Sequence, residues 1–437
     1  MTASAVPAGG AHAIRPARSA DAVVTAGEVA AFALGTVTWL EIQFLGRMYL
    51  GELGLAVCAI ALPVLWRRVR RDGAGRRVLA WYIALFAIYF VGLILTDLYR
   101  GSGFTDFARG WARALFLFTN TIGLLVIGYD RPRQLVAWIG GQAVSGLLVV
   151  ALGYVQYGMI LWKFGLALPV TVGLLVLTDS RRSTWALLVL LALGALNLLL
   201  DYRSVAGFCC VAALLLYYKS KRDRGARLRA VFATGLVTTA IGAGFLALYS
   251  SGALLGDPTF GRDIVERRRD SNIERLAGLV IGVQAVRASP IVGYGSWARS
   301  SELFDNWAVI QEEMGSTVTA AGRALGREER GELDVIPTHS QVLQGWVEAG
   351  IPGVAFFVFL LVALIVLLRV LIRRPGIDRV FALTAFWAVS TIWAVAMSPF
   401  SGLVRLHDAM AFALLFVLST GSARGLRASR PPTAPAV

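Results

Sequence analysis

One histidine is the residue of this chain best suited to acid–base chemistry. His339 lies in Pro337-Thr338-His339-Ser340-Gln341, where Thr338 and Gln341 have the spacing of a capping box. Gly350 is placed to end the helix that this box would begin. The spacing predicts that His339 occupies the first position of a short helix, whose dipole favours a neutral imidazole. Such an imidazole can act as a general base; the alternative is a histidine that only hydrogen-bonds to loop backbone.

Arginine is concentrated upstream of that histidine. Five arginines lie within fourteen residues, namely Arg262, Arg267, Arg268, Arg269 and Arg275. Ser271 and Glu274 form a second potential capping box, which predicts a helix that begins at Ser271 and ends at Ser289-Pro290. Arg275 would lie in the first turn of this helix, away from the helix's apolar face. The alternative is an amphipathic helix at the membrane surface whose arginines contact lipid phosphates.

The elements that must position these residues are apolar. The chain has 437 residues, of which 57% are hydrophobic and only 16% are charged, against about 25% charged in soluble domains. Apolar runs of about twenty residues recur along it, which predicts an all-α polytopic membrane protein. We expect twelve spans, at about 27–45, 49–66, 78–98, 110–128, 134–154, 159–178, 184–201, 203–218, 230–250, 353–372, 379–397 and 403–420.

Arginine and lysine content predicts the orientation of these spans. Alternate loops are basic, with Arg67, Arg68, Arg70, Arg71, Arg76 and Arg77 in the first and further basic residues in 131–133, 181–182, 219–229 and 369–379. All of them fall on one side if both termini are cytoplasmic. The loop at 250–348 then falls outside; it holds ten Arg and fourteen Asp or Glu, a net charge of −4 in a chain of +15. Topology thus explains the basic composition, and no nucleic-acid partner is expected.

Several basic residues nevertheless lie at outer span ends. They are Arg47, Arg100, Arg109, Arg113, Lys163, Arg203 and Arg405. Snorkelling or pairing with Glu41, Asp97, Asp106, Asp201 or Asp408 is one explanation. Together they also suggest an outward basic pocket for a phosphate-bearing ligand. His407, beside Asp408, ranks second to His339, because an ordinary hydrogen-bonded pair explains it.

Neither a metal site nor a cofactor is expected. The three cysteines lie inside apolar runs without CxxC spacing, the three histidines are too few for a cluster, and no Asp-x-Asp occurs. No cleavable signal peptide is evident, because the first 25 residues lack an apolar core. The tail 1–26 is expected to be disordered and cytoplasmic.

Three motifs resemble the O-antigen ligase family, the polytopic membrane enzymes that share the ligase and polymerase signature region. They are Tyr202-Arg203-Ser204; Glu274-Arg275-Leu276 followed by Ser289-Pro290 and Gly293-Tyr294-Gly295; and Thr338-His339-Ser340-Gln341-Val342-Leu343-Gln344 leading to Glu348-Ala349-Gly350-Ile351-Pro352-Gly353. The resemblance covers about residues 200–365. Ser340 stands where many relatives have Asn.

This resemblance implies a metal-independent glycosyltransferase of the bacterial inner membrane, with a GT-C-like fold. Residues 27–250 would form spans one to nine, 251–352 a periplasmic catalytic loop containing short helices, 353–420 the last three spans and 421–437 a cytoplasmic tail. The donor would be a glycan on undecaprenyl pyrophosphate and the acceptor the lipid A–core oligosaccharide. A polymerase, a protein O-oligosaccharyltransferase and a polyprenyl-glycan transporter remain alternatives.

The expected mechanism is a single displacement with inversion. His339 would accept the proton of the acceptor hydroxyl, while Arg203 and Arg275 would hold the pyrophosphate and stabilise its developing charge. Further contacts to substrate are expected from Arg47, Arg100, Arg109, Arg113, Arg262, Arg267, Arg268, Arg269, Tyr294 and Arg405.

Overall fold

The structure, a computed structural model, describes residues 24–43, 47–153, 161–223, 258–316 and 334–420. The predicted span at 230–250, both predicted tails apart from residues 24–26, and residues 317–333 of the acidic segment lie outside this part of the chain. The described residues are almost entirely helical, as expected; their only strands are the two short ones of a hairpin.

Long apolar helices form the body of the molecule. Five of the described helices have the length and composition of membrane spans: α4 (Gly73–Arg100), α5 (Phe104–Gly128), α6 (Pro132–Ala151), α15 (Ile351–Arg373) and α17 (Gly402–Ser419). A sixth span results if α2 (Leu50–Ala59) and α3 (Leu62–Val69), which are bent by 60°, count as one. The protein is therefore a multi-pass membrane protein.

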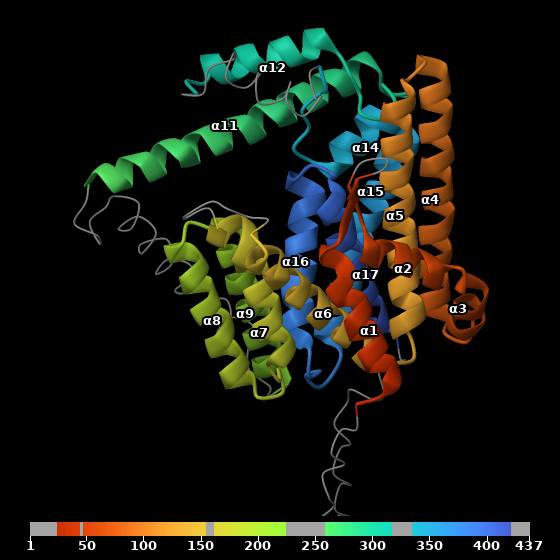
Figure 1. The fold of residues 1–437 in the computed structure, drawn as a ribbon, viewed down its shortest axis with the longest axis vertical. Helices are drawn as coiled ribbons and strands as arrows, with labels where there is room; N and C mark the ends of the chain where they lie inside the picture. The colour runs from red at the N-terminus through yellow and green to blue at the C-terminus, as the bar shows by residue number, and fades with distance from the viewer. Residues whose placement is uncertain (1–23, 44–46, 154–160, 224–257, 317–333, 421–437) are drawn as a thin grey trace, which may run out of the picture.

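Shorter apolar helices complete the bundle. They are the π-helical turn η2 (Trp162–Leu166) with α7 (Ala167–Leu177), α8 (Ser183–Leu199) and α16 (Phe381–Met397), and α9 (Arg203–Asp223) packs against α8 and α16. Figure 1 shows α16 and α17 between a flank of α4 and α5 and a flank of α7, α8 and α9. The central helices α16 and α17 are the most completely buried, with Phe381, Trp387 and Phe412 inaccessible to solvent.

The first predicted span is not one helix. A capping box of Thr25 and Glu28 begins α1 (Ala26–Thr36), but the helix ends after eleven residues. A single turn η1 (Val37–Trp39) and a hairpin of β1 (Glu41–Gln43) and β2 (Arg47–Tyr49) follow, with Glu41 opposite Tyr49. The β-branched run Thr36-Val37-Thr38 favours this end, because β-branched residues weaken a helix.

Three polar-segment helices cross one end of the bundle (Figure 1): α11 (Pro258–Ala288), α12 (Ser301–Glu313) and α14 (Gln341–Ala349). They share a small apolar core of their own, which includes Ile281, Phe304, Trp307 and Val347. The loops that join the spans contact one another in two groups. At the end near α14, Asp97 contacts Ser296 and Gln344 contacts Phe400.

At the other end, the basic loops contact one another. The ammonium of Lys219 donates to the carbonyls of Leu371 and Arg374, and the amide of Ser180 donates to the carbonyl of Arg379. Arg68 lies 3.4 Å from Asp130. Each group of contacts joins loops that arginine content assigns to one side of the membrane.

Candidate active site

His339 lies just before helix α14. The helix begins at Gln341, and its N-cap is Ser340, whose hydroxyl accepts a hydrogen bond from the amide of Leu343 at 3.4 Å. The predicted cap at Thr338 is therefore wrong by two residues, because the backbone is still extended at Ser340, with φ −157° and ψ 131°. His339 is thus not a helical residue, and its side chain is 20% exposed.

Helix α11 forms the wall against which His339 packs. It begins at Pro258 and runs unbroken through Ser271, so the predicted helix start at Ser271 is wrong and the helix is long. It ends at Ala288, before Ser289-Pro290, as expected. A Cβ on Gly278 would lie 2.7 Å from His339 Cδ2, so the missing side chain allows the imidazole to contact the helix.

The same face of α11 carries charge next to the imidazole. Nε2 of His339 lies 3.8 Å from Oε1 of Glu274, one turn before Gly278. This is longer than a hydrogen bond.

The positive charge of Arg275 acts on the turn between α8 and α9. Asp201 in that turn has φ 56°, a left-handed conformation that aspartate tolerates, and Arg203 begins α9. Burial raises the pKa of the Tyr202 phenol, and the positive charge of Arg275 acts against that rise. Arg275 is therefore within electrostatic reach of the residue before Arg203.

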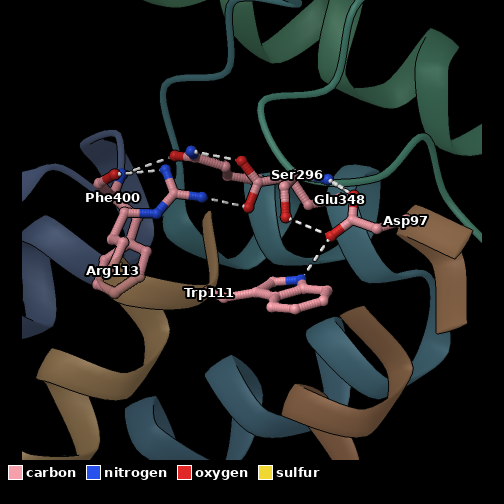
Figure 2. A network of polar contacts seen from close by, with 7 residues as sticks. Asp97, Trp111, Arg113, Ser296, Glu348 and Phe400 are labelled. Carbon is pink, nitrogen blue, oxygen red and sulfur yellow. Dashed lines mark hydrogen bonds and ion pairs between the residues drawn. The ribbon is translucent and has the colours of Figure 1, made fainter. Parts of the chain in front are cut away.

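Two other predicted ligand-binding arginines hold buried carboxylates instead. Arg113 donates to Glu348 at 2.5 Å and to the carbonyl of Phe400 at 3.0 Å, as Figure 2 shows. Arg405 donates to Glu52 at 2.5 and 2.8 Å and lies over the ring of Phe116. These side chains are almost inaccessible, so the expectation that Arg113 and Arg405 bind substrate is corrected. A buried guanidinium needs a paired carboxylate.

Arg100 and Tyr294 belong to a clamp on the loop after α11. Arg100 donates to the carbonyl of Gly293 at 2.9 Å and to the hydroxyl of Ser289 at 2.7 Å, and its guanidinium lies 5.2 Å from the ring centre of Tyr294. Asp97 accepts hydrogen bonds from the amide and hydroxyl of Ser296 and from the indole of Trp111, each at 2.7 Å (Figure 2).

The Gly293-Tyr294-Gly295 turn then joins this loop to α14. Tyr294 and Gly295 donate from their amides to the carbonyls of Val347 and Glu348 at 2.7 and 3.0 Å. Gly293 has φ 82°, and a Cβ there would lie 2.7 Å from the Val347 carbonyl, so glycine is required for both reasons. The predicted turn is present, and it is a structural joint between α11 and α14.

Three other arginines that were predicted to contact substrate lie nearer the surface. Arg47 is exposed and 3.5 Å from Glu41, Arg109 lies over the ring of Trp297, and exposed Arg269 approaches the carbonyl of Met314 at 3.4 Å. Arg262, Arg267 and Arg268 belong to α11, but their side chains are outside the described part of the structure.

His407 is not paired with Asp408 as expected. The two are consecutive in α17 and so point in different directions. His407 packs on Trp387, with ring centres 4.8 Å apart, and its Nε2 has no hydrogen-bond partner in the described structure. The sequence predicts only a capping role for Glu274, together with Ser271, whereas the structure places Glu274 beside His339. Its place in the motif Glu274-Arg275-Leu276 was the available signal.

No three His, Cys, Asp or Glu side chains are grouped for a metal within the described ranges. Comparison with models of known protein families and with curated protein sequences finds no match for this chain.

Proposed function

We propose that this chain is a glycosyltransferase of the O-antigen ligase family, which transfers O-antigen polysaccharide from undecaprenyl pyrophosphate to lipid A–core oligosaccharide. One observation carries the proposal. Glu274 and Gly278 of α11 lie against His339, and the charge of Arg275 acts on Tyr202, the residue before Arg203. These residues belong to the three motifs that resemble the family, or lie next to them, and they come from three distant parts of the chain.

In this proposal His339 takes the proton from the attacking hydroxyl of the acceptor. A bond forms between that oxygen and the anomeric carbon, while the bond from this carbon to the pyrophosphate oxygen breaks. Glu274 would hold the Nε2–H tautomer of His339, which leaves Nδ1 to accept the proton, and its charge would stabilise the imidazolium. At 3.8 Å the two atoms are not hydrogen-bonded, and such catalytic contacts often tighten only when substrate binds.

Arg275 and Arg203 would bind the pyrophosphate. Guanidinium groups bind phosphate oxygens in bidentate fashion. Their positive charge would stabilise the negative charge that develops on the leaving group, an effect worth about 10²–10³ in rate for a single donor.

The finer topology belongs to the proposal as well. The chain would cross the inner membrane twelve times, with α1, η1 and β1 making the first crossing. His339 would face the periplasm, because the arginine-rich loops lie at the opposite end of the bundle.

The test is transfer by the purified protein in detergent, offered a glycan on undecaprenyl pyrophosphate and three acceptors in separate reactions. Glycosylated lipid A–core supports the ligase. Product only on a second lipid-linked glycan would assign a polymerase, and product only on peptide serine or threonine would assign a protein O-oligosaccharyltransferase. Absence of transfer to every acceptor would contradict the enzyme and favour a transporter, since detergent provides no compartments between which glycan could be moved.

A further inference from the structure

A separate cavity lies at the end of the bundle away from His339. It has a volume of about 180 Å³ and lies between α3, the end of α5 and the start of α6. Its walls are apolar and are made by Ala61, Val64, Leu65, Val126 and Ile127. Its remaining lining is polar and consists of Arg68, Asp130, Arg131 and Gln134.

The helices around this cavity fix its depth in the membrane. Helices α5 and α6 are both long enough to span a bilayer, and they meet in the turn between Gly128 and Pro132. This turn must therefore lie at the bilayer surface. Helix α3 departs from α2 by 60°, buries Leu65 and Val69, and carries Arg67 and Arg68 in its last turn. The polar rim is thus at headgroup level, and the apolar walls face the acyl region.

The rim has the chemistry of a phosphate site. Arg68 lies 3.4 Å from Asp130, and both side chains are about half exposed. Arg131 is the next residue and is also exposed. Two guanidinium groups and one carboxylate leave one positive charge, which matches the single negative charge of a phosphodiester. Asp130 and Gln134 provide an acceptor and an amide for headgroup hydroxyls.

We infer that this cavity binds an anionic glycerophospholipid. Arg68 and Arg131 would hold its phosphate, and one acyl chain would lie against Val64, Val126 and Ile127. The neighbouring arginines Arg70 and Arg71 do not line the cavity and would not contact the bound lipid. This site does not depend on the proposed transferase activity.

The experiment measures thermal unfolding of the full chain in detergent with added dioleoylphosphatidylglycerol. Lipid that binds the folded state raises the unfolding midpoint. We expect the Arg68→Gln/Arg131→Gln variant to need about thirtyfold more lipid for the same shift, given about 1 kcal/mol for each arginine at a membrane surface. Arg70→Gln/Arg133→Gln removes the same charge from exposed positions outside the cavity and should respond like the parent.

Val64→Trp tests the apolar wall without altering charge, and it too should weaken the response. An equal response in both double variants would overturn the site. So would an equal shift with phosphatidylcholine, which would show a general lipid effect. An equal shift with inorganic phosphate would overturn the lipid assignment in favour of a free anion.

Discussion

Arg113 of α5 and Glu348 of α14 form a buried ion pair, with Nη2 and Oε2 2.5 Å apart and both side chains at most 6% exposed. Glu348 also accepts a hydrogen bond from Gln344 at 3.0 Å, and Gln344 in turn accepts one from the amide of Phe400 at 2.7 Å. The pair therefore ties α14, and with it His339, to a membrane-spanning helix and to the α16–α17 turn.

Removal of one charge from this pair should destabilise the protein strongly. Glu348→Gln leaves the guanidinium of Arg113 buried without a counter-charge, at a cost of about 3–5 kcal/mol. We expect a lower unfolding midpoint in detergent. Glu313→Gln, which removes an exposed carboxylate from α12, is the control and should change little. A midpoint equal to that of the parent would mean that the pair contributes little to stability.

The contact between α11 and His339 makes a second prediction. Gly278→Ala places a Cβ 2.7 Å from His339 Cδ2, so the imidazole must move. If His339 is the base, glycan transfer should fall by about 10²-fold, since a shift of about 1 Å in a catalytic group has that effect. Gly207→Ala in α9 is the matched control, because a Cβ there would meet nothing within 4 Å.

The unfolding midpoint separates this effect from loss of fold. A Gly278→Ala protein with the parent's midpoint and little activity supports a positioning role for the glycine. Full activity would show that the imidazole need not stay against α11.

Sequence patterns were sufficient to locate the described spans but insufficient to establish their continuity. Long apolar runs identify helices such as α4 and α15, because backbone in lipid must hydrogen-bond internally. They did not reveal the hairpin after α1, which lies inside an apolar run long enough for a span. Both helix starts predicted from capping boxes were wrong. One reason is that a Ser-x-x-Glu pattern also occurs inside a long helix, as at Ser271 in α11.

The sequence predicted which types of residue form the candidate site, but it did not predict which residues pair with one another. From the sequence alone, Arg113, Arg405 and Arg100 could not be distinguished from arginines that bind a ligand. Their partners Glu348 and Glu52 and the carbonyl of Gly293 lie roughly 190 to 350 residues away along the chain. Contacts at such separation depend on the tertiary fold, which no local pattern encodes.

The two arginines assigned to pyrophosphate should be sensitive to shape as well as charge. Arg203→Lys and Arg275→Lys keep the charge but lose the planar bidentate donor. We expect each to reduce transfer by about 10-fold or more while protein yield and midpoint stay unchanged. Arg287→Lys, at an exposed position near the end of α11, is the control. Parent activity in Arg203→Lys would argue that this residue has no direct contact with the donor.

The clamp at Asp97 should hold the loop between α11 and α12 in place. Asp97→Asn weakens its bonds from the Ser296 amide and hydroxyl and the Trp111 indole, each worth about 1.5–3 kcal/mol when the acceptor is charged. We expect faster proteolytic cleavage near residues 289–300 than in Asp106→Asn, which alters only the more exposed pair with Arg299. Equal cleavage in both variants would contradict the clamp.

Glu274 provides the sharpest test of the proposed base. If its carboxylate stabilises the imidazolium of His339 across 3.8 Å, Glu274→Gln should reduce transfer by about 10-fold without affecting donor binding, since only the protonated histidine is stabilised. His339→Gln should reduce transfer further, by about 10²–10⁴-fold. The double variant should be no slower than His339→Gln alone, because Glu274 acts only through the imidazole. Additive losses would show that Glu274 contacts substrate directly, and full transfer in His339→Gln would remove the histidine from the mechanism.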